Sequence, residues 1–380
     1  MNIYFFIIDM QGKLKLLVPL LIATLLLSPT SADISKSNNS KENRYAKNAI
    51  DLLNKDYSGE FLTFMTWHSA NIMENLANYM IYTNDTSYVP EIELIYNITY
   101  GNIDNFIDTM YNDDLLWFSL GFLRSFDLTK DYKYVVIAEY IYEHLIQYWD
   151  DECGGGIYWN REMEYKNAIT NLLFRTTSYK LSHLDWSKKG TIFYQEWYNK
   201  SERWINLQNN FINPQSEKDH IYLVNDGLTD QCQNNNYTTW TYNQGLSLYP
   251  TTDYTKSINI IDSTIGYLSD DGILQELCEF NSSRCIPECP SCDNDQSQFK
   301  GIFIRYLRYF LDTYKDQITK IDKNKYQKYE QFITRNRDQI LSVYGNHDNE
   351  YGLKWVSANH GTYYNFVTQS SAIDLLSAAY

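Results

Sequence analysis

Helical periodicity recurs along almost the whole chain and constrains its fold more than any other feature. From Asp131 to Trp149, and again from Phe299 to Phe310, apolar residues return at the i, i+3, i+4, i+7 spacing of a buried helical stripe. About twelve segments pass the same test. They cover residues 43–55, 60–82, 90–108, 112–128, 131–149, 165–183, 190–206, 239–249, 253–268, 298–316, 325–343 and 369–380. Such a series predicts an all-α protein.

A short turn pattern recurs between these segments. Thr83–Tyr88, Thr129–Tyr134 and Thr251–Tyr254 each place a Thr and an Asp before a Tyr that opens the next helical stretch. Thr and Asp side chains favour turns and helix caps. Recurring helical hairpins indicate a solenoid or a closed ring. Six hairpins would close as an (α/α)6 toroid, in which loops at one end of the inner helices form a cleft.

Charge and composition narrow the class of ligand. The chain has 380 residues and a formal net charge of −15, which argues against nucleic acid or an anionic membrane surface as partner. Hydrophobic residues make up 44% and aromatic residues 16%, including 35 Tyr. Exposed rings would suit stacking on sugars, although the same rings could simply fill the core. We expect a monomer that binds a polysaccharide or oligosaccharide and uses no cofactor or metal.

Residues 1–32 have the pattern of a signal peptide. Lys13 and Lys15 precede an apolar stretch, Leu16 to Leu27, and small residues follow at 30–32. The stretch is too short for a comfortable membrane span. An uncleaved signal anchor and a start at Met10 are alternatives. Residues 33–42 predict a flexible polar tail, and residues 43–380 a single catalytic domain of a secreted protein.

Six cysteines and several sequons fit export from the cell. The cysteines are Cys153, Cys232, Cys278, Cys285, Cys289 and Cys292. The last four could bind zinc, but an exported chain favours two local disulfides, in which case Cys153 and Cys232 would pair with each other. Six cysteines allow fifteen pairings, so the connectivity is open. Sequons at Asn38, Asn84, Asn97, Asn199, Asn236 and Asn281 predict a glycoprotein.

Asp113 and Asp114 are the strongest candidates for catalysis. Asn112 can cap a helix whose first turn would hold both acids, with Tyr111 and Trp117 beside them. Acids in a first turn are often merely solvated and favoured by the helix dipole. Two close carboxylates in an aromatic site would instead repel, so that one pKa rises and the other stays low, as a glycosidase requires. Asp150–Asp151 and Asp270–Asp271 are rival pairs.

Three further segments combine aromatic rings with polar groups and could bind a polyhydroxyl ligand. They are Trp149–Asn160 with its three glycines, Tyr165–Ala168 and Trp240–Gly245. Tight turns and helix caps are the ordinary explanation of each. The candidate binding residues are Trp117, Asp151, Gly155, Trp159, Lys166, Asn167, Tyr242, Asn243 and Gln244.

An ordered set of motifs resembles glycoside hydrolase family 76, the endo-α-1,6-mannanase family that includes fungal cell-wall members. The motifs are WHSAN (67–71), YNDDLLW (111–117), WDDECGGGIYWN (149–160), YKNAITN (165–171), WTYNQG (240–245) and FKGIFIRYL (299–307). The resemblance implies an (α/α)6 fold and retaining hydrolysis of α-1,6-mannosidic linkages. It also implies Asp113 as nucleophile and Asp114 as general acid/base.

Two alternatives remain open on the same scaffold. The first is a transglycosylase that joins wall glycans through the same covalent intermediate. The second is a glycan-binding protein without turnover, against which the retained Asp113–Asp114 pair argues.

Overall fold

The computed structural model describes two units of the chain, Met1–Ser40 and Lys41–Tyr380. In the first, strands β1 (Phe6–Ile8) and β2 (Leu14–Leu16) pair antiparallel, and from residue 39 a helix begins. In the second, the described residues are 41–184, 188–207, 211–212, 221–236, 238–280, 292–344, 348–357 and 364–380. The apolar stretch 17–27 and most of the polar tail lie outside the described residues.

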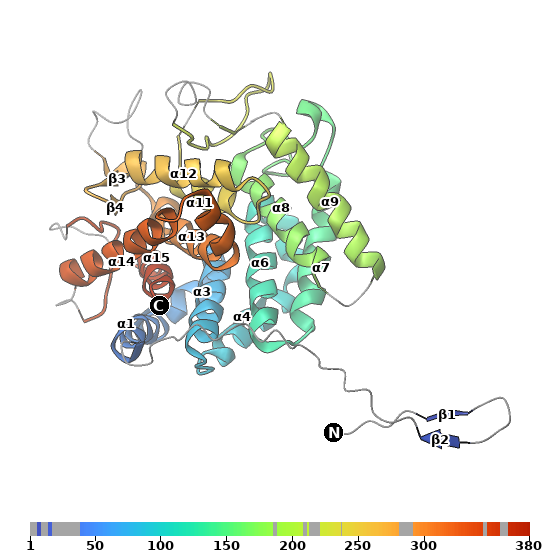
Figure 1. The fold of residues 1–380 in the computed structure, drawn as a ribbon, viewed down its shortest axis with the longest axis horizontal. Helices are drawn as coiled ribbons and strands as arrows, with labels where there is room; N and C mark the ends of the chain where they lie inside the picture. The colour runs from blue at the N-terminus through green and yellow to red at the C-terminus, as the bar shows by residue number, and fades with distance from the viewer. Residues whose placement is uncertain are drawn as a thin grey trace. The chain divides into compact units, whose positions relative to one another are not determined.

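Six helices form a closed inner ring in the second unit (Figure 1). In chain order, α3 packs on α6, α6 on α8, α8 on α11, α11 on α13, α13 on α15, and α15 returns to α3. Their bounds are α3 Trp67–Thr83, α6 Asn112–Thr129, α8 Ala168–Ser182, α11 Thr241–Leu248, α13 Asn294–Ile321 and α15 Phe366–Ala378.

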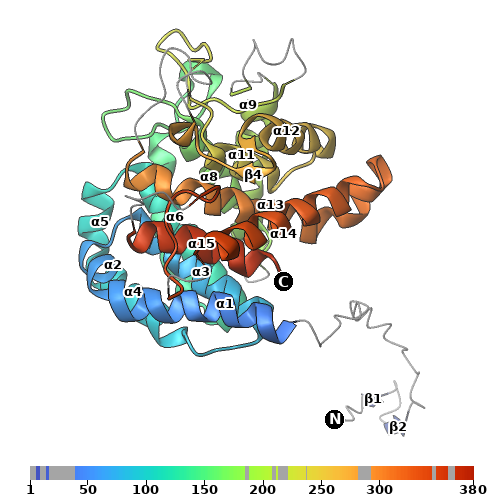
Figure 2. The same ribbon diagram turned by 90° about the vertical axis from the view of Figure 1, so that its left-hand side faces the viewer.

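An outer set of helices covers this ring. Helix α4 packs on α3, α7 on α6, α9 on α8, α12 on α11 and α14 on α13. Helix α1 lies along α15 through a bond from Gln369 Nε2 to the Ala49 carbonyl at 2.9 Å, and Figure 2 shows α15 between α1 and α13. The bounds are α1 Asn39–Leu52, α4 Val89–Gly101, α7 Lys133–Leu145, α9 Lys188–Leu207, α12 Tyr254–Tyr267 and α14 Lys325–Tyr344. The prediction of an all-α (α/α)6 toroid is confirmed.

Short elements join the hairpins. A π-helical turn Leu53–Tyr57 and α2 (Ser58–Phe64) follow α1, and α5 (Ile103–Thr109) follows α4. Among the described residues, 3₁₀ turns occupy Ile146–Tyr148, Glu152–Gly154 and Leu277–Glu279. Strands β3 (Ser269–Asp270) and β4 (Ile273–Leu274) pair antiparallel, with Ser269 opposite Leu274.

Two predicted segments are each divided into two helices. Segment 60–82 breaks at Met65, whose φ of 41° is left-handed, before α3 begins. Segment 90–108 breaks at Asn102, where α4 ends and α5 starts. Left-handed backbone at a residue other than glycine, as at Met65, has little sequence signal. Asn102 leaves the helical region at φ −125° and ψ 18°. Periodicity alone joined the helices on either side of both residues.

The repeated Thr–Asp turn has the same hydrogen bond in all three places. The hydroxyls of Thr83, Thr129 and Thr251 accept from the backbone N–H two residues later, at 3.2, 3.2 and 3.1 Å. The side-chain carboxylates of these residues, Asp85, Asp131 and Asp253, then accept from a backbone N–H near the start of the next helix, at 2.9 to 3.1 Å. Three inner helices therefore turn into their outer partners in one way.

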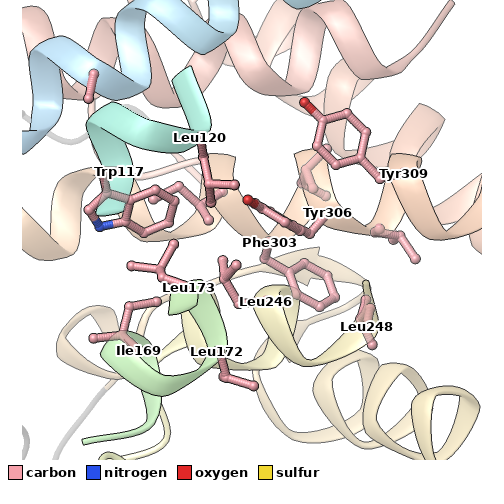
Figure 3. Packing of buried hydrophobic residues seen from close by; sticks show 14 of the residues in the cluster. Trp117, Leu120, Ile169, Leu172, Leu173, Leu246, Leu248, Phe303, Tyr306 and Tyr309 are labelled. Atoms are coloured by element: carbon pink, nitrogen blue, oxygen red, sulfur yellow. The ribbon is translucent and has the colours of Figure 1, made fainter. Parts of the chain in front are cut away.

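Close packing of the inner helices fixes their first turns relative to one another. Side chains from α6, α8, α11 and α13 meet inside the ring, among them Trp117, Leu173, Leu246 and Phe303 (Figure 3). A Cβ at Gly245 would lie 2.7 Å from the Phe303 Cα, and one at Gly301 would lie 2.6 Å from the Ser371 Cα. Glycine therefore lets α13 approach both α11 and α15.

Candidate active site

The first turns of the inner helices meet at one end of the ring, around a cavity of about 530 Å³. Five inner helices contribute a residue near their start: Trp67 of α3, Asp113 of α6, Asn167 before α8, Tyr242 of α11 and Asp295 of α13. The amino-terminal ends of helices carry partial positive charge. Their convergence favours negatively charged groups in the cavity, where the carboxyls lie.

The position of Asp113 and Asp114 depends on the residue before them. Asn112 is the first residue of α6 rather than its cap, which is Tyr111. The Asn112 backbone N–H donates to the Trp159 carbonyl at 2.9 Å, and its side-chain amide donates to the Tyr158 carbonyl at 2.9 Å. This buried residue ties the start of α6 to the segment after the glycine-rich loop. Both aspartates then line the cavity.

The two carboxyls are held differently. Asp113 Oδ2 accepts from the Trp159 indole N–H at 3.0 Å, and Oδ1 accepts from the Asp114 backbone N–H at 3.1 Å. Burial raises the pKa of Asp113 from 3.8 to about 7, against the lowering effect of these hydrogen bonds. Burial raises the pKa of Asp114 well above 3.8, and the charges of Asp113 and Asp295 raise it further. The proton therefore favours Asp114.

Two more carboxyls line the cavity. Asp295 Oδ1 accepts from the Trp67 indole N–H at 3.1 Å and lies 3.4 Å from His68 Nε2. Burial lowers the pKa of His68 to about 3, so this ring is neutral at pH 7. Asp226 accepts from the Tyr165 hydroxyl at 2.6 Å. Burial raises the pKa of both Asp226 and Asp295 above the ordinary value.

Paired aromatic rings form much of the remaining wall. Tyr111 stacks on Trp159 with ring centroids 4.5 Å apart and planes 2° from parallel. Tyr242 stacks on Phe299 at 3.8 Å, and Trp67 on Trp117 at 5.9 Å. Flat apolar surfaces beside carboxyl oxygens can contact both the C–H face and the hydroxyl groups of a sugar ring.

The structure brings most of the predicted residues together. Lining the cavity are Asp113, Asp114, Trp117, Trp159, Asn167 and Tyr242. The Asn167 side-chain oxygen also caps α8 by accepting from the Thr170 backbone N–H at 3.1 Å.

The other predicted residues do not line the cavity. The Lys166 ammonium is nearly buried and binds Asp150 together with the carbonyls of Glu152 and Gly155, at 2.7 and 2.8 Å to the carbonyls. The Gln244 amide pairs with the backbone of Val224 at 2.8 Å in both directions. Gly155 packs against Trp149 and Trp204, Asn243 is fully buried and Asp151 is exposed. Local bonding or packing uses Lys166, Gln244 and Gly155 instead.

Asp295, Trp67 and Phe299 are cavity residues that the sequence did not single out as binding residues. Asp295 lies in the first turn of an inner helix, as Asp113 does, and the preceding Asp293 caps that helix. The predicted segment 298–316 starts too late to include Asp295. The capping-box pattern of Asp293 and Gln296 is the sequence signal that starts the helix at Asn294 and so places Asp295 in its first turn.

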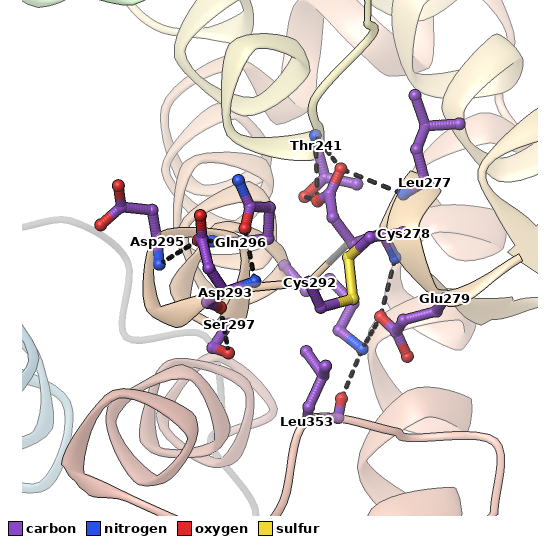
Figure 4. The surroundings of a disulfide bond; sticks show 12 residues. Thr241, Leu277, Cys278, Glu279, Cys292, Asp293, Asp295, Gln296, Ser297 and Leu353 are labelled. Atoms are coloured by element: carbon purple, nitrogen blue, oxygen red, sulfur yellow. Dashed lines mark hydrogen bonds and ion pairs between the residues drawn. A yellow bond between two sulfur atoms is a disulfide. The ribbon is translucent and has the colours of Figure 1, made fainter. Parts of the chain in front are cut away.

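Two disulfides hold the loops around the cavity. Cys153 bonds to Cys232, as predicted, and ties the glycine-rich loop to the segment after Asp226. Cys278 bonds to Cys292, which removes the zinc alternative. Figure 4 shows this second bond below Thr241 of α11 and beside the start of α13, where Asp293 follows Cys292. Buried Glu276 accepts from the Thr241 backbone N–H at 3.2 Å and so caps α11 from this segment. Cys285 and Cys289 lie outside the described residues.

The described residues contain no group of three His, Cys, Asp or Glu side chains placed to hold a metal ion. Within that same part of the chain, no helix has the length and apolar character needed to cross a bilayer.

The model of glycosyl hydrolase family 76 matches residues 36–380. The chain belongs to this family. It is 25% identical to the mannan endo-1,6-alpha-mannosidase DCW1 of Candida albicans, over 63% of this chain and 57% of that protein. It is 22% identical to the Saccharomyces cerevisiae protein of the same name, over 63% of this chain and 56% of that one. The chain thus spans less than two thirds of the length of these relatives.

Solved structures share the fold over most of their length. An inactive variant of the alpha-1,6-mannanase GH76A of Salegentibacter sp. HEL1_6, in complex with alpha-1,6-mannotriose, has a TM-score of 0.70 and 21% identity. That match covers 89% of this chain and 98% of that one. Dfg5 of Chaetomium thermophilum, in complex with glucosamine, has a TM-score of 0.64 and 16% identity, and 90% of each chain is covered.

Proposed function

We propose that this protein is a retaining glycoside hydrolase that cleaves α-1,6-mannosidic linkages in mannan-type glycans. One observation carries the proposal: Asp113 and Asp114 share a buried, aromatic-walled cavity, in which two N–H donors hold Asp113, while burial and the charges of Asp113 and Asp295 raise the pKa of Asp114. Membership of the family supports the reaction class. The names of the DCW1 relatives and of the mannotriose-bound neighbour support the linkage.

The unequal environments give each carboxyl a role. Asp113, as carboxylate, attacks the anomeric carbon while Asp114 transfers its proton to the departing glycosidic oxygen. The bond to the leaving sugar breaks as the bond to Asp113 forms. Asp114, now a carboxylate, takes a proton from water, and the resulting hydroxide displaces Asp113 and regenerates both groups. Two inversions at one carbon retain its configuration.

The cavity walls supply sugar contacts in this proposal. Trp117, Trp159 and Tyr242 offer ring faces, and the amide N–H₂ of Asn167 can donate to a hydroxyl because its oxygen caps α8. Asp226 and Asp295 each keep an oxygen that can accept from a sugar hydroxyl, since the protein bonds described for each carboxyl use its other oxygen. We also infer that the protein acts outside the cytosol, where the two disulfides among its described residues would persist.

Hydrolysis of linear α-1,6-mannan by the wild-type protein and by Asp113→Asn tests this proposal. We expect release of reducing sugar from the wild type and none above background from the variant. Asp151→Asn is a matched control, because this exposed neighbour of another aspartate lies outside the cavity. Equal activity of Asp113→Asn and wild type would overturn the assignment. Sizing the products with an added acceptor oligosaccharide would show whether sugar transfer competes with hydrolysis.

A further inference from the structure

A second hollow lies on the outside of the ring, between α4 and α7. Its volume is about 620 Å³, and its lining includes Tyr96, Tyr100, Ile103, Lys133, Val136 and Tyr140. We call this hollow the outer groove. None of its lining residues belongs to the catalytic cavity.

Large apolar side chains are unusually exposed in the outer groove. Tyr100 is 61% exposed, Val136 57% and Tyr140 51%. The Tyr96 and Tyr100 rings lie nearly parallel, 11° apart, with centroids at 5.7 Å. A contiguous exposed apolar surface on a secreted enzyme commonly marks a binding site.

Polar groups surround these rings. Lys133 pairs with Glu93 at 2.5 Å and lies 5.1 Å from the centre of the Tyr96 ring. The Tyr140 hydroxyl donates to Asp104 at 3.3 Å. Ring faces edged by hydroxyl, carboxylate and ammonium groups match a sugar, which has an apolar C–H face and a rim of hydroxyls. A purely apolar partner would leave these polar groups without water.

The outer groove is connected to the catalytic cavity by one short helix. Ile103, at the start of α5, lines the groove, and Thr109, at its end, lines the cavity. Asp104, Asp108 and Thr109 are exposed along this helix. At 1.5 Å per residue, α5 separates the two sites by about 10 Å. A polymer could therefore occupy both, whereas an oligosaccharide bound within the cavity would not contact the groove.

We propose that the outer groove is a secondary glycan-binding site that holds a mannan-type chain outside the catalytic cavity. The identity of the glycan rests on the proposed function. Binding at the groove raises the local concentration of the same chain at the cavity. The groove therefore strengthens binding of long substrates and leaves turnover of short ones unchanged.

Retention in native gels that contain linear α-1,6-mannan measures this binding. Every protein carries Asp113→Asn, so that the polymer stays intact, and Asn97→Gln, because this exposed sequon residue lies next to Tyr96. The test variant adds Tyr100→Ala and Tyr140→Ala. The control adds Tyr267→Ala, which removes a tyrosine of similar exposure, 52%, from the end of α12.

The double substitution should weaken polymer binding about tenfold, since the loss of one or two ring contacts amounts to about that factor. With Asp113 restored, kcat/KM on α-1,6-mannotriose should stay unchanged, and the Tyr267→Ala control should match its parent in both assays.

Unchanged retention of the double variant would overturn the inference. If retention is unchanged but sedimentation differs from the parent protein, the groove is a contact between proteins instead. If the restored enzyme fails to cleave mannan but retention still depends on Tyr100 and Tyr140, the hydrolase proposal falls and the glycan site stands.

Discussion

Asp113–Asp114 and Asp150–Asp151 are both adjacent aspartate pairs beside a tryptophan-containing segment, yet their surroundings differ. The first pair lines a cavity in which no Lys or Arg is among the described lining residues. In the second pair, Asp150 binds the nearly buried Lys166 and accepts from the Tyr158 hydroxyl at 3.1 Å.

This difference sets the charge that each pair carries. Although burial acts to raise the pKa of Asp150, the hydrogen bond and charge of Lys166 keep it below its ordinary value. Burial acts on Asp113 and Asp114 without a cation to oppose it, so the pKa of each is raised. The ammonium of Lys166 keeps Asp150 ionised, so this aspartate has a structural role. Without a neighbouring cation, Asp113 and Asp114 can exchange a proton near neutral pH.

Replacing Asp114, the proposed proton donor, should have the largest effect of the changes that test this comparison. Asp114→Asn should lower kcat/KM on α-1,6-mannan by about 10²- to 10⁴-fold, the usual contribution of a general acid/base. Asp151→Asn should change it less than about threefold, since a substitution on an exposed surface has little effect. Comparable losses in both variants would contradict the distinction between the pairs.

Stability against pH tests the raised pKa of Asp113. The folded chain binds this proton more tightly than the unfolded chain, so wild-type stability should fall as pH rises from about 4 to about 7. Asp113→Asn removes this titration. Its free energy of unfolding should exceed that of the wild type by about 2 kcal/mol at pH 8, and by less at pH 4. Urea unfolding at the two pH values measures the difference. A constant gap between the two proteins would argue against a buried, proton-binding Asp113.

Most of the fold followed from local sequence. Helical periodicity predicted the twelve main helices that the structure describes, and the Thr–Asp turn predicted where three inner helices reverse, because both depend on neighbouring residues. Closure of the ring depends on contacts between distant residues. Gly301 meeting Ser371 is one such contact, and no local pattern indicates it.

The site was harder to predict, because partners far apart in the chain decide it. Lys166 and Gln244 have the chemistry of sugar-binding residues, but Asp150 and Val224 engage them within the protein. Asp295 enters the cavity beside Trp67, which lies 228 residues away. Periodicity places such residues on a helix, but it does not reveal which side chain meets another.

Replacing Asp150, the aspartate that binds Lys166, should lower the stability of the fold, whereas Asp113→Asn should raise it. Asp150→Asn leaves the Lys166 ammonium, whose side chain is 3% exposed, without its ion-pair partner. We expect the free energy of unfolding to fall by about 1–2 kcal/mol, because Asp150 itself is one-third exposed and solvent screens the pair. Asp270→Asn, in an exposed aspartate pair, is the control. Equal stability of the two variants in urea unfolding would show that Lys166 does not depend on Asp150.

The smallest expected effect isolates one hydrogen bond to the proposed nucleophile. Trp159→Phe keeps a ring against Tyr111 but removes the indole N–H that donates to Asp113. That bond lowers the pKa of Asp113, so its loss should raise the pKa and move the acidic limb of the kcat/KM profile to higher pH. At the optimum, kcat/KM should fall about threefold to tenfold, which corresponds to one hydrogen bond. Tyr111→Phe preserves the stacked ring and the N–H, so its acidic limb should stay in place. An unshifted limb in Trp159→Phe would mean that Asp113 does not titrate on that side of the profile, and would reverse the roles proposed for the two aspartates.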